Sequence, residues 1–371
     1  MIRVPGILTM LQSFCSSTRL AVLGLALALP LQAQETDTVY LRDGATEVGK
    51  VLEENLDGVQ FQPEKGAKKL LAWDNVQSIQ YFDAPEELAN GLASLGAGNP
   101  EAALAQFQAL LGLEGVRGPQ VQNALFHAAF SQQRLGQTDA AIASYAKVLK
   151  DFPKTRYLRS VGENLIELHL GKNDVASARA ALDGIGVGAK GTEGLEPLLA
   201  LLEARFLETQ KKFAEARERY AGVESLAGAP AAMAQEGKLG RARMLLRENK
   251  SGEAEPLLRA LVGESASPRV QSGAWNGIGE IQATDGRAKK DAEKILEGLY
   301  AYLRTVVQYK PLPGESTEEH ERALAGAANC FQLLSELEQN SEKKKLYRER
   351  QRERLDQLQR DYPGSSFLPK K

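Results

Sequence analysis

The chain has 371 residues, of which 43% are apolar and 25% are charged, and its formal net charge is -2. This length allows two or more modules with a sizeable buried core. Because a nucleic-acid partner requires clustered cations against its phosphates, the near balance of charge excludes that class of partner from our expectations.

Residues 1–33 are predicted to be a signal peptide. Arg3 and Arg19 precede an uncharged run from Leu20 to Leu31, and Ala33 offers a small residue for cleavage. The run is shorter than the roughly 20 residues of a membrane span, so we expect export to the periplasm or the extracellular space, with no stable span after cleavage. An uncleaved N-terminal anchor is the alternative, because Leu31 is large for its place in a cleavage motif.

Residues 37–83 have a sequence pattern that predicts a small β module. Short runs rich in Val, Ile, Tyr and Thr alternate with turn dipeptides such as Asp43-Gly44 and Asp57-Gly58, a pattern typical of hairpins. We expect five strands, at residues 38–41, 47–54, 59–63, 69–73 and 76–82. Five short strands suit a small closed barrel similar to the SH3 and Sm folds, since closure removes exposed edges.

Residues 85–365 are dominated by strong helix formers and read as paired helices. Three distant stretches end in the same way, with apolar residues at helical spacing before Pro153, Pro311 and Pro363. Small and aromatic landmarks also recur at intervals near 38 residues: Gly98, Ala103 and Phe107, then Gly136, Ala141 and Tyr145, and more weakly Gly171, Ala178, Ala216, Tyr220, Ala254 and Leu258.

A further match is Trp275, Ile278, Gly279 and Gly286, which follow the first half of a tetratricopeptide repeat, with Gly286 expected in the turn. With these landmarks the chain resembles the tetratricopeptide repeat family. The resemblance implies a mainly α fold, an α-solenoid of helix pairs, that binds protein or peptide partners on its concave face. We expect the last helix, about residues 342–360, to form a polar cap.

No motif indicates an enzyme, a cofactor or a metal site. Gly186 to Gly191 matches a dinucleotide fingerprint formally, but an alanine-rich helix precedes it where a strand is required, so a flexible glycine-rich loop is expected over residues 184–194. His127, His169 and His320 lack a second ligand at helical spacing. The charged run of residues 343–354 is interpreted as helix-surface ion pairs, with a site for an anionic partner as the alternative.

The candidate partner-binding residues lie on one predicted helix. In the register implied by the resemblance, Asn123, Phe126, Phe130 and Gln133 face the concave side. Phe126 and Phe130, one turn apart, would provide an apolar peptide groove. The alternative is that the two rings pack in the core.

We therefore expect an exported, non-enzymatic scaffold of the cell envelope. Its helices that end in Phe-Pro and Tyr-Pro are similar to those of the periplasmic repeat protein of the Tol-Pal system and of outer-membrane assembly lipoproteins. The β module is a departure from both of these systems. The alternative function is carbohydrate or peptidoglycan binding through Tyr40, Trp73 and Tyr81 of the β module.

Overall fold

The computed structural model describes residues 36–192, 194–265, 267–311 and 316–369. The predicted signal peptide lies outside the described residues. Residues 36–371 form one compact unit. In the part of the chain that is described, no helix has both the length and the apolar content that a membrane span needs.

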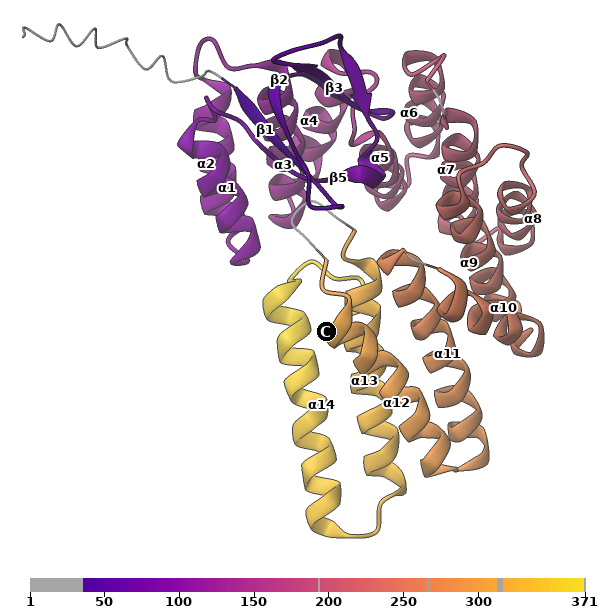
Figure 1. The fold of residues 1–371 in the computed structure, drawn as a ribbon. Coiled ribbons are helices and arrows are strands. Elements are labelled where there is room, and N and C mark those ends of the chain that lie inside the picture. Colours follow the sequence, from indigo (N-terminus) through magenta and orange to yellow (C-terminus); the bar gives the residue numbers. More distant parts are fainter. Residues whose placement is uncertain (1–35, 193, 266, 312–315, 370–371) are drawn as a thin grey trace, which may run out of the picture. The chain divides into compact units, whose positions relative to one another are not determined.

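The N-terminal module is an antiparallel sheet with the strand order β4-β3-β2-β1-β5 (Figure 1). Its strands are β1 (Asp37–Leu41), β2 (Thr46–Asn55), β3 (Gly58–Pro63), β4 (Lys69–Leu71) and β5 (Val76–Gln80). Side chains from all five strands, including Val39, Val51 and Phe61, share one buried cluster, which requires the sheet to curve.

The predicted closed barrel is wrong, because β4 and β5 remain the two edges of an open sheet. β4 has only three residues, and the helical turn Trp73–Asn75 separates it from β5. Closure would need a continuous ladder between these two strands. The short β4 offers too few backbone groups to form one, so the sheet curves without closing.

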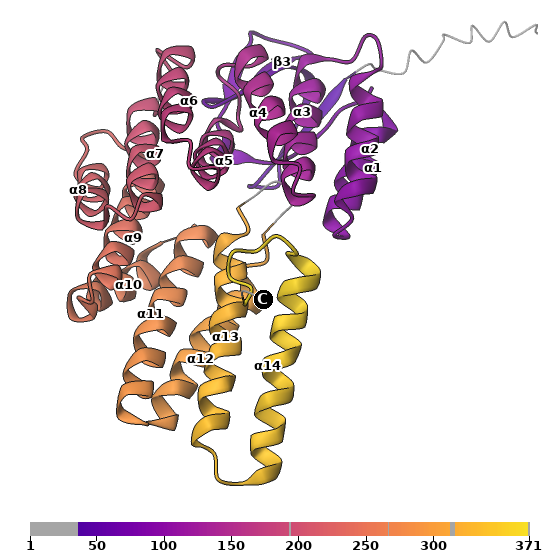
Figure 2. The same cartoon turned by 180° about the vertical axis from the view of Figure 1, so that it is seen from behind.

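The helices of the described residues form seven consecutive pairs, in which each helix packs on the next (Figures 1 and 2). The pairs are α1 (Glu86–Gly96) and α2 (Pro100–Leu111), α3 (Gly118–Arg134) and α4 (Thr138–Asp151), α5 (Leu158–Gly171) and α6 (Val175–Gly188), α7 (Leu195–Thr209) and α8 (Phe213–Glu224), α9 (Ala231–Arg247) and α10 (Ser251–Glu264), α11 (Pro268–Lys289) and α12 (Ala292–Gln308), and α13 (Glu318–Leu337) and α14 (Ser341–Asp361). This arrangement confirms the predicted solenoid of helix pairs.

The recurrent small residues lie where the paired helices approach most closely. One alanine sits at the fourth position of each second helix from α2 to α10 and is completely buried: Ala103, Ala141, Ala178, Ala216 and Ala254. A glycine on a neighbouring helix makes room for an aromatic ring in the same way. A Cβ atom on Gly91 of α1 would lie 2.5 Å from Cε1 of Phe107. The helices can therefore pack closely only because these positions are small.

Two predicted loops are helical instead. Gly286 lies inside the 22-residue helix α11, buried against Ile295, and the turn follows at Lys290, which has a left-handed backbone. Gly184, Gly186 and Gly188 belong to the last turns of α6 rather than to a loop. Packing of the buried Ile185 beside them outweighs the low helix propensity of glycine.

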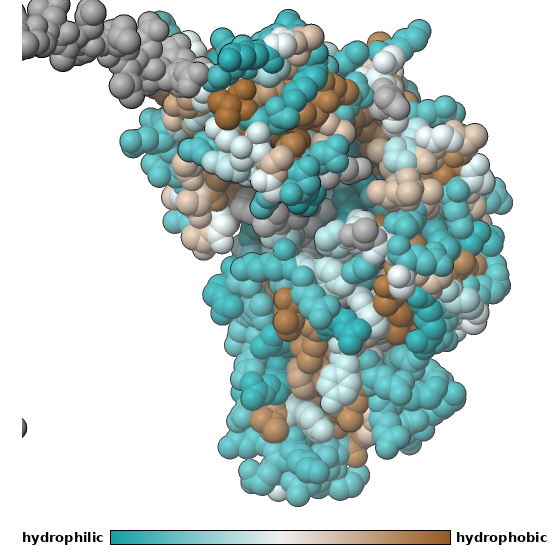
Figure 3. All heavy atoms as spheres, in the orientation of Figure 1, coloured by the Kyte–Doolittle hydropathy of each residue, from teal (hydrophilic) through white to brown (hydrophobic). Residues whose placement is uncertain are grey.

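The last helix, α14, is amphipathic only weakly. Leu358 is its one buried residue, and ion pairs such as Arg350 with Glu353, 2.8 Å apart, lie on its surface. Figure 3 shows α14 mostly hydrophilic, with a narrow apolar strip where it lies beside its neighbours. The helix thus closes the end of the array with a polar surface, as predicted.

The sheet lies against the helices at α3 and α4 (Figures 1 and 2). Arg117, just before α3, contacts Asp37 of β1 at 2.7 Å, and the Asp37 side chain is fully buried. Arg156, in the segment after α4, contacts Glu54 of β2 at 2.7 Å. Because both carboxylates are inaccessible to solvent, these ion pairs are buried contacts that hold the sheet against the helices.

Candidate binding cavity on the first helices of the pairs

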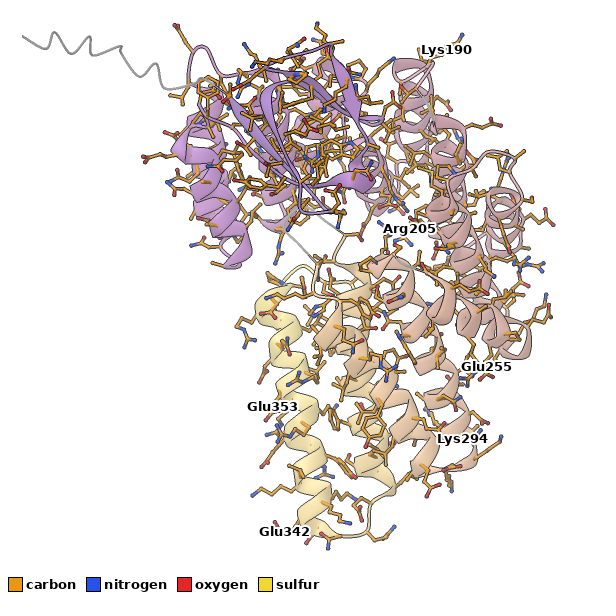
Figure 4. The ribbon with its side chains drawn as sticks, in the orientation of Figure 1. Lys190, Arg205, Glu255, Lys294, Glu342 and Glu353 are labelled. Atoms are coloured by element: carbon orange, nitrogen blue, oxygen red, sulfur yellow. The ribbon has the colours of Figure 1, made fainter. Side chains whose placement is uncertain are left out.

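The first helices of successive pairs share a face that carries arginine and glutamate side chains, which we call the charged face. Arg205 of α7, labelled in Figure 4, extends toward α13, where the Glu318 carboxylate accepts its hydrogen bond at 2.6 Å. Arg269 of α11 donates to Glu163 of α5 at 2.8 Å. Each contact joins helices that are far apart in the order of the array.

Two further arginines extend the charged face. Arg243 of α9 contacts Glu208 of α7 at 3.1 Å and Glu319 of α13 at 3.2 Å. Arg159 of α5 donates to Glu236 of α9 at 2.6 Å. Five first helices, from α5 to α13, are thereby connected through side-chain ion pairs.

The pKa of Glu163 reports how strongly the charged face holds its carboxylates ionised. Burial alone would raise the pKa of Glu163, but the positive charges of Arg269 and Arg159 lower it to about 2. The pKa of Glu318 is also lowered, by Arg205, Arg243 and Arg322, against the effect of burial. Both carboxylates are therefore held ionised by arginine partners.

A cavity of about 200 Å³ opens at one end of the charged face. Its walls come from α3, α5, α7, α11, the start of α13 and the C-terminal segment. The side chains that matter for its chemistry are Phe130, Gln133 and Arg134, Glu163 and Glu167, Arg205, Arg269, Glu318 and Glu321, and those of the segment from Tyr362 to Phe367. We call it the Glu167 cavity. Its volume corresponds to about seven water molecules, or to one long side chain of a partner.

Glu167 is the one carboxylate of this cavity that has neither an ion-pair nor a hydrogen-bond partner within the described residues. Its side chain is exposed to the cavity, but the surrounding protein raises its pKa by desolvation, and Glu318 and Glu321 raise it further while Arg205 opposes them. A cation placed in the cavity would relieve this repulsion.

The C-terminal segment forms the aromatic side of the Glu167 cavity. The Tyr362 hydroxyl lies 2.9 Å from Nδ1 of His320 on α13. The guanidinium of Arg134 on α3 lies over the Tyr362 ring at 5.4 Å and donates to the carbonyl oxygen of Asp361. The last helix pair therefore contacts the second one, and both contribute to the cavity.

Only two of the four predicted site residues line this cavity, namely Phe130 and Gln133. Gln133 accepts a hydrogen bond from the Tyr145 hydroxyl at 2.9 Å. Asn123 accepts one from the Tyr157 hydroxyl at 2.6 Å. Phe126 is completely buried, stacked on the Tyr157 ring with 4.0 Å between centroids, so the packing alternative applies to this ring.

Glu167 and the C-terminal segment were not among the residues predicted to form the site. Arg159, Glu163 and Glu167 recur every four residues on α5 and therefore share one helix face, which is the local signal that was available. The partners of Arg159 and Glu163 lie on α9 and α11, 77 and 106 residues away, and a single sequence does not indicate such pairings.

The three aromatic residues of the alternative carbohydrate site do not form one platform. The Arg156 guanidinium stacks on Trp73 at 4.2 Å, and the indole Nε1 donates to the carbonyl oxygen of Asn55 at 2.7 Å. The Tyr81 hydroxyl donates to Glu54. Tyr40 is exposed, while Trp73 and Tyr81 are partly buried against the core of the sheet.

The described residues contain no group of three or more His, Cys, Asp or Glu side chains arranged to hold a metal ion. The Cys330 thiol is buried in the core of α13, and burial raises its pKa to about 12. A thiol with this pKa remains protonated at neutral pH, so Cys330 acts as a packing residue.

Comparison with known proteins gives one family. Residues 123–155, which cover most of α3 and all of α4, match the model for the tetratricopeptide repeat. No curated protein matches the chain. Among solved structures, it is similar to a tetratricopeptide repeat protein from Parabacteroides merdae ATCC 43184, with 13% identity and a TM-score of 0.37, over 72% of this chain and 98% of that one.

Proposed function

We propose that this protein is a protein-binding scaffold of the cell envelope, and that the Glu167 cavity receives a cationic side chain or terminal amine of its partner. Tetratricopeptide repeats generally mediate interactions between proteins, and residues 123–155 match one. The observation that carries the proposal is the unpaired Glu167 carboxylate in a cavity that Phe130, Tyr362 and Phe367 also line.

The chemistry of these lining groups defines the ligand. A carboxylate in partly desolvated surroundings attracts a cation more strongly than one in bulk water. Aromatic faces attract the same ions through their quadrupoles. Arg269 and Arg205 also line the cavity, but they are paired with Glu163 and Glu318, and Arg134 donates to the carbonyl oxygen of Asp361. An anionic ligand would therefore meet the unpaired charge of Glu167. A lysine, an arginine or an N-terminal amine of a partner protein is the class that fits.

The proposed envelope location depends on residues 1–33, whose composition is that of an export signal. Fractionation of cells that express the full chain would test it. Recovery of the processed protein from the periplasm or the medium supports the proposal, and recovery of the full-length chain from the cytoplasm contradicts it.

Site-specific photocrosslinking would test the binding site. A benzoylphenylalanine at position 133, on the cavity wall, should give partner adducts in cells, and the same probe at position 342 at the start of α14 should not (Figure 4). Glu167→Gln should reduce the adducts at position 133 by roughly tenfold, since it removes a charge-assisted contact. Equal adducts at both positions, or adducts indifferent to Glu167→Gln, would contradict the proposed site.

A further inference from the structure

A second hollow lies where the sheet meets the helices, well away from Glu167. It is an open groove of about 470 Å³ between β2, the start of α3 and the segment that follows α4. Figures 1 and 2 both place the sheet against α3 and α4 at this point. We call it the β2–α4 groove.

The walls of the groove are held by hydrogen bonds and are therefore preformed. The backbone N–H of Leu56 donates to the carbonyl oxygen of Lys154 at 2.8 Å, and Asn55 forms an antiparallel bridge with Thr155. A β-bulge at Leu52 shifts the register of β2 against β3. Bulges often redirect a side chain at a functional site, and Leu52 is part of the groove wall.

The groove combines apolar walls with one unsatisfied acceptor. Leu52, Pro119, Phe152 and Pro153 provide the apolar surface. Gln122, which is 1% exposed, also lines it. Its Nε2 donates to the carbonyl oxygen of Glu54 at 3.0 Å, so the orientation of the amide is fixed. Its Oε1 is buried and has no hydrogen-bond partner in the described part of the chain.

A buried acceptor without a partner is costly, and a ligand that donates to it recovers that cost. The groove does not favour a charged ligand of either sign. Glu54 is paired with Arg156, and Asp151 is paired with Lys147. The remaining charged residues of the wall, Glu53 and Lys154, have opposite signs. The complementary side chain is therefore uncharged, largely apolar and a donor only. Tryptophan has these properties, since its indole N–H donates and accepts nothing.

We propose that the β2–α4 groove binds a tryptophan side chain of an extended segment of a partner protein, with the indole N–H donating to Oε1 of Gln122. The volume holds on the order of fifteen water molecules, which is more than one ring needs and leaves room for flanking backbone. This site is separate from the Glu167 cavity and does not depend on the ligand proposed there.

The test uses two capped pentapeptides, Ser-Gly-Trp-Gly-Ser and the same peptide with benzothienylalanine, in which sulfur replaces the indole N–H. Titration into the isotope-labelled full chain, followed by NMR, should give saturable shifts at residues of the groove. The tryptophan peptide should bind about three- to tenfold more tightly than its analogue, as one neutral hydrogen bond predicts. Gln122→Met, of similar shape, should bind both peptides equally.

A second variant keeps the test decisive if Gln122→Met disturbs the fold. Leu52→Asp, on the groove wall, should abolish binding of both peptides, while Leu346→Asp on α14, which is 47% exposed, should leave it unchanged. Equal affinities of the two peptides for the native chain, absence of saturable shifts, or selectivity retained in Gln122→Met would each overturn the proposal. Partner adducts at position 133 are expected to persist in Leu52→Asp.

Discussion

Glu163 is the residue at which pH and stability are most directly linked. Its pKa in the folded chain is about 2, against 4.5 as the ordinary value. The ionised form therefore stabilises the fold, fully above pH 4.5, and this contribution is lost as the pH falls toward 2. The difference in pKa corresponds to about 3 kcal/mol of unfolding free energy. Solvent screening reduces this contribution, because the Glu163 side chain is 19% exposed.

We expect urea unfolding midpoints to fall between pH 4.5 and pH 2 in the native chain. Glu163→Gln should be less stable at pH 7, because it leaves Arg159 and Arg269 with fewer partners. Its midpoint should change less over the same acidic range. A matched control is Glu349→Gln on α14. The carboxylate of Glu349 is exposed, and its ion pair with Lys345 is long, at 4.0 Å. If Glu163→Gln and Glu349→Gln gave the same pH profile as the native chain, the assigned linkage would be wrong.

Among single residues, the sequence predicts packing better than it predicts the site. The buried alanines from Ala103 to Ala254 were identified because their spacing follows the repeat. Phe126 and Phe130 have the same chemistry and lie one turn apart, yet Phe126 is buried and Phe130 lines the cavity. The difference arises from the position of Tyr157 on the following pair, which local periodicity does not specify.

Two neighbouring helices can approach closely where one of them has a glycine opposite a large side chain of the other. Gly240 of α9 faces Tyr220 of α8, and a Cβ atom there would lie 2.5 Å from Cε1 of that buried ring. Gly222 of α8 is exposed, and a Cβ atom added to it would meet nothing within 4 Å. Both glycines are helical and differ mainly in their surroundings, so they form a matched pair.

Gly240→Ala should lower the free energy of unfolding by about 1–3 kcal/mol, because overpacking outweighs the gain in helix propensity. Gly222→Ala should raise it by up to about 1 kcal/mol through propensity alone. Thermal unfolding followed by circular dichroism would measure both. Stabilisation by Gly240→Ala would mean that α8 and α9 are not packed as closely as described.

At the scale of elements, helix existence was predictable and helix ends were less so. The first five pairs follow from the recurrence of small residues, and the sixth from the match at Trp275. Gly184 to Gly188 were misplaced into a loop because glycine usually breaks helices, and Gly286 was misplaced into a turn by the register of the resemblance. The sheet shows a similar limit. Its strands follow from alternation and turn dipeptides, whereas closure depends on pairing between β4 and β5, which no local pattern encodes.

For the molecule as a whole, the charged face joins pairs that are not neighbours in the array. Arrays in which each repeat contacts only its neighbours unfold in parts. Here Glu163 of the third pair contacts Arg269 of the sixth, and Arg205 of the fourth contacts Glu318 of the seventh. These arginines and glutamates look like ordinary solvated helix positions in the sequence, so this level of organisation was not predictable.

We expect these contacts to make unfolding cooperative, so that hydrogen exchange of α5 and of α13 occurs with similar opening free energies in the native chain. The double variant Arg205→Met and Glu318→Gln removes both partners of this contact. It also removes the ion pairs of Arg205 with Glu208 and of Glu318 with Arg243 and Arg322, so it weakens the charged face at α13 as a whole. It should accelerate exchange in α13 by about tenfold relative to α5, as the loss of roughly 1.4 kcal/mol of coupling would require. A double variant of the exposed α14 pair, Arg350→Met and Glu353→Gln, serves as the control and should change neither helix. Uniform acceleration of α5 and α13 would indicate that coupling passes through the stacked neighbours, and the charged face would then contribute stability without cooperativity.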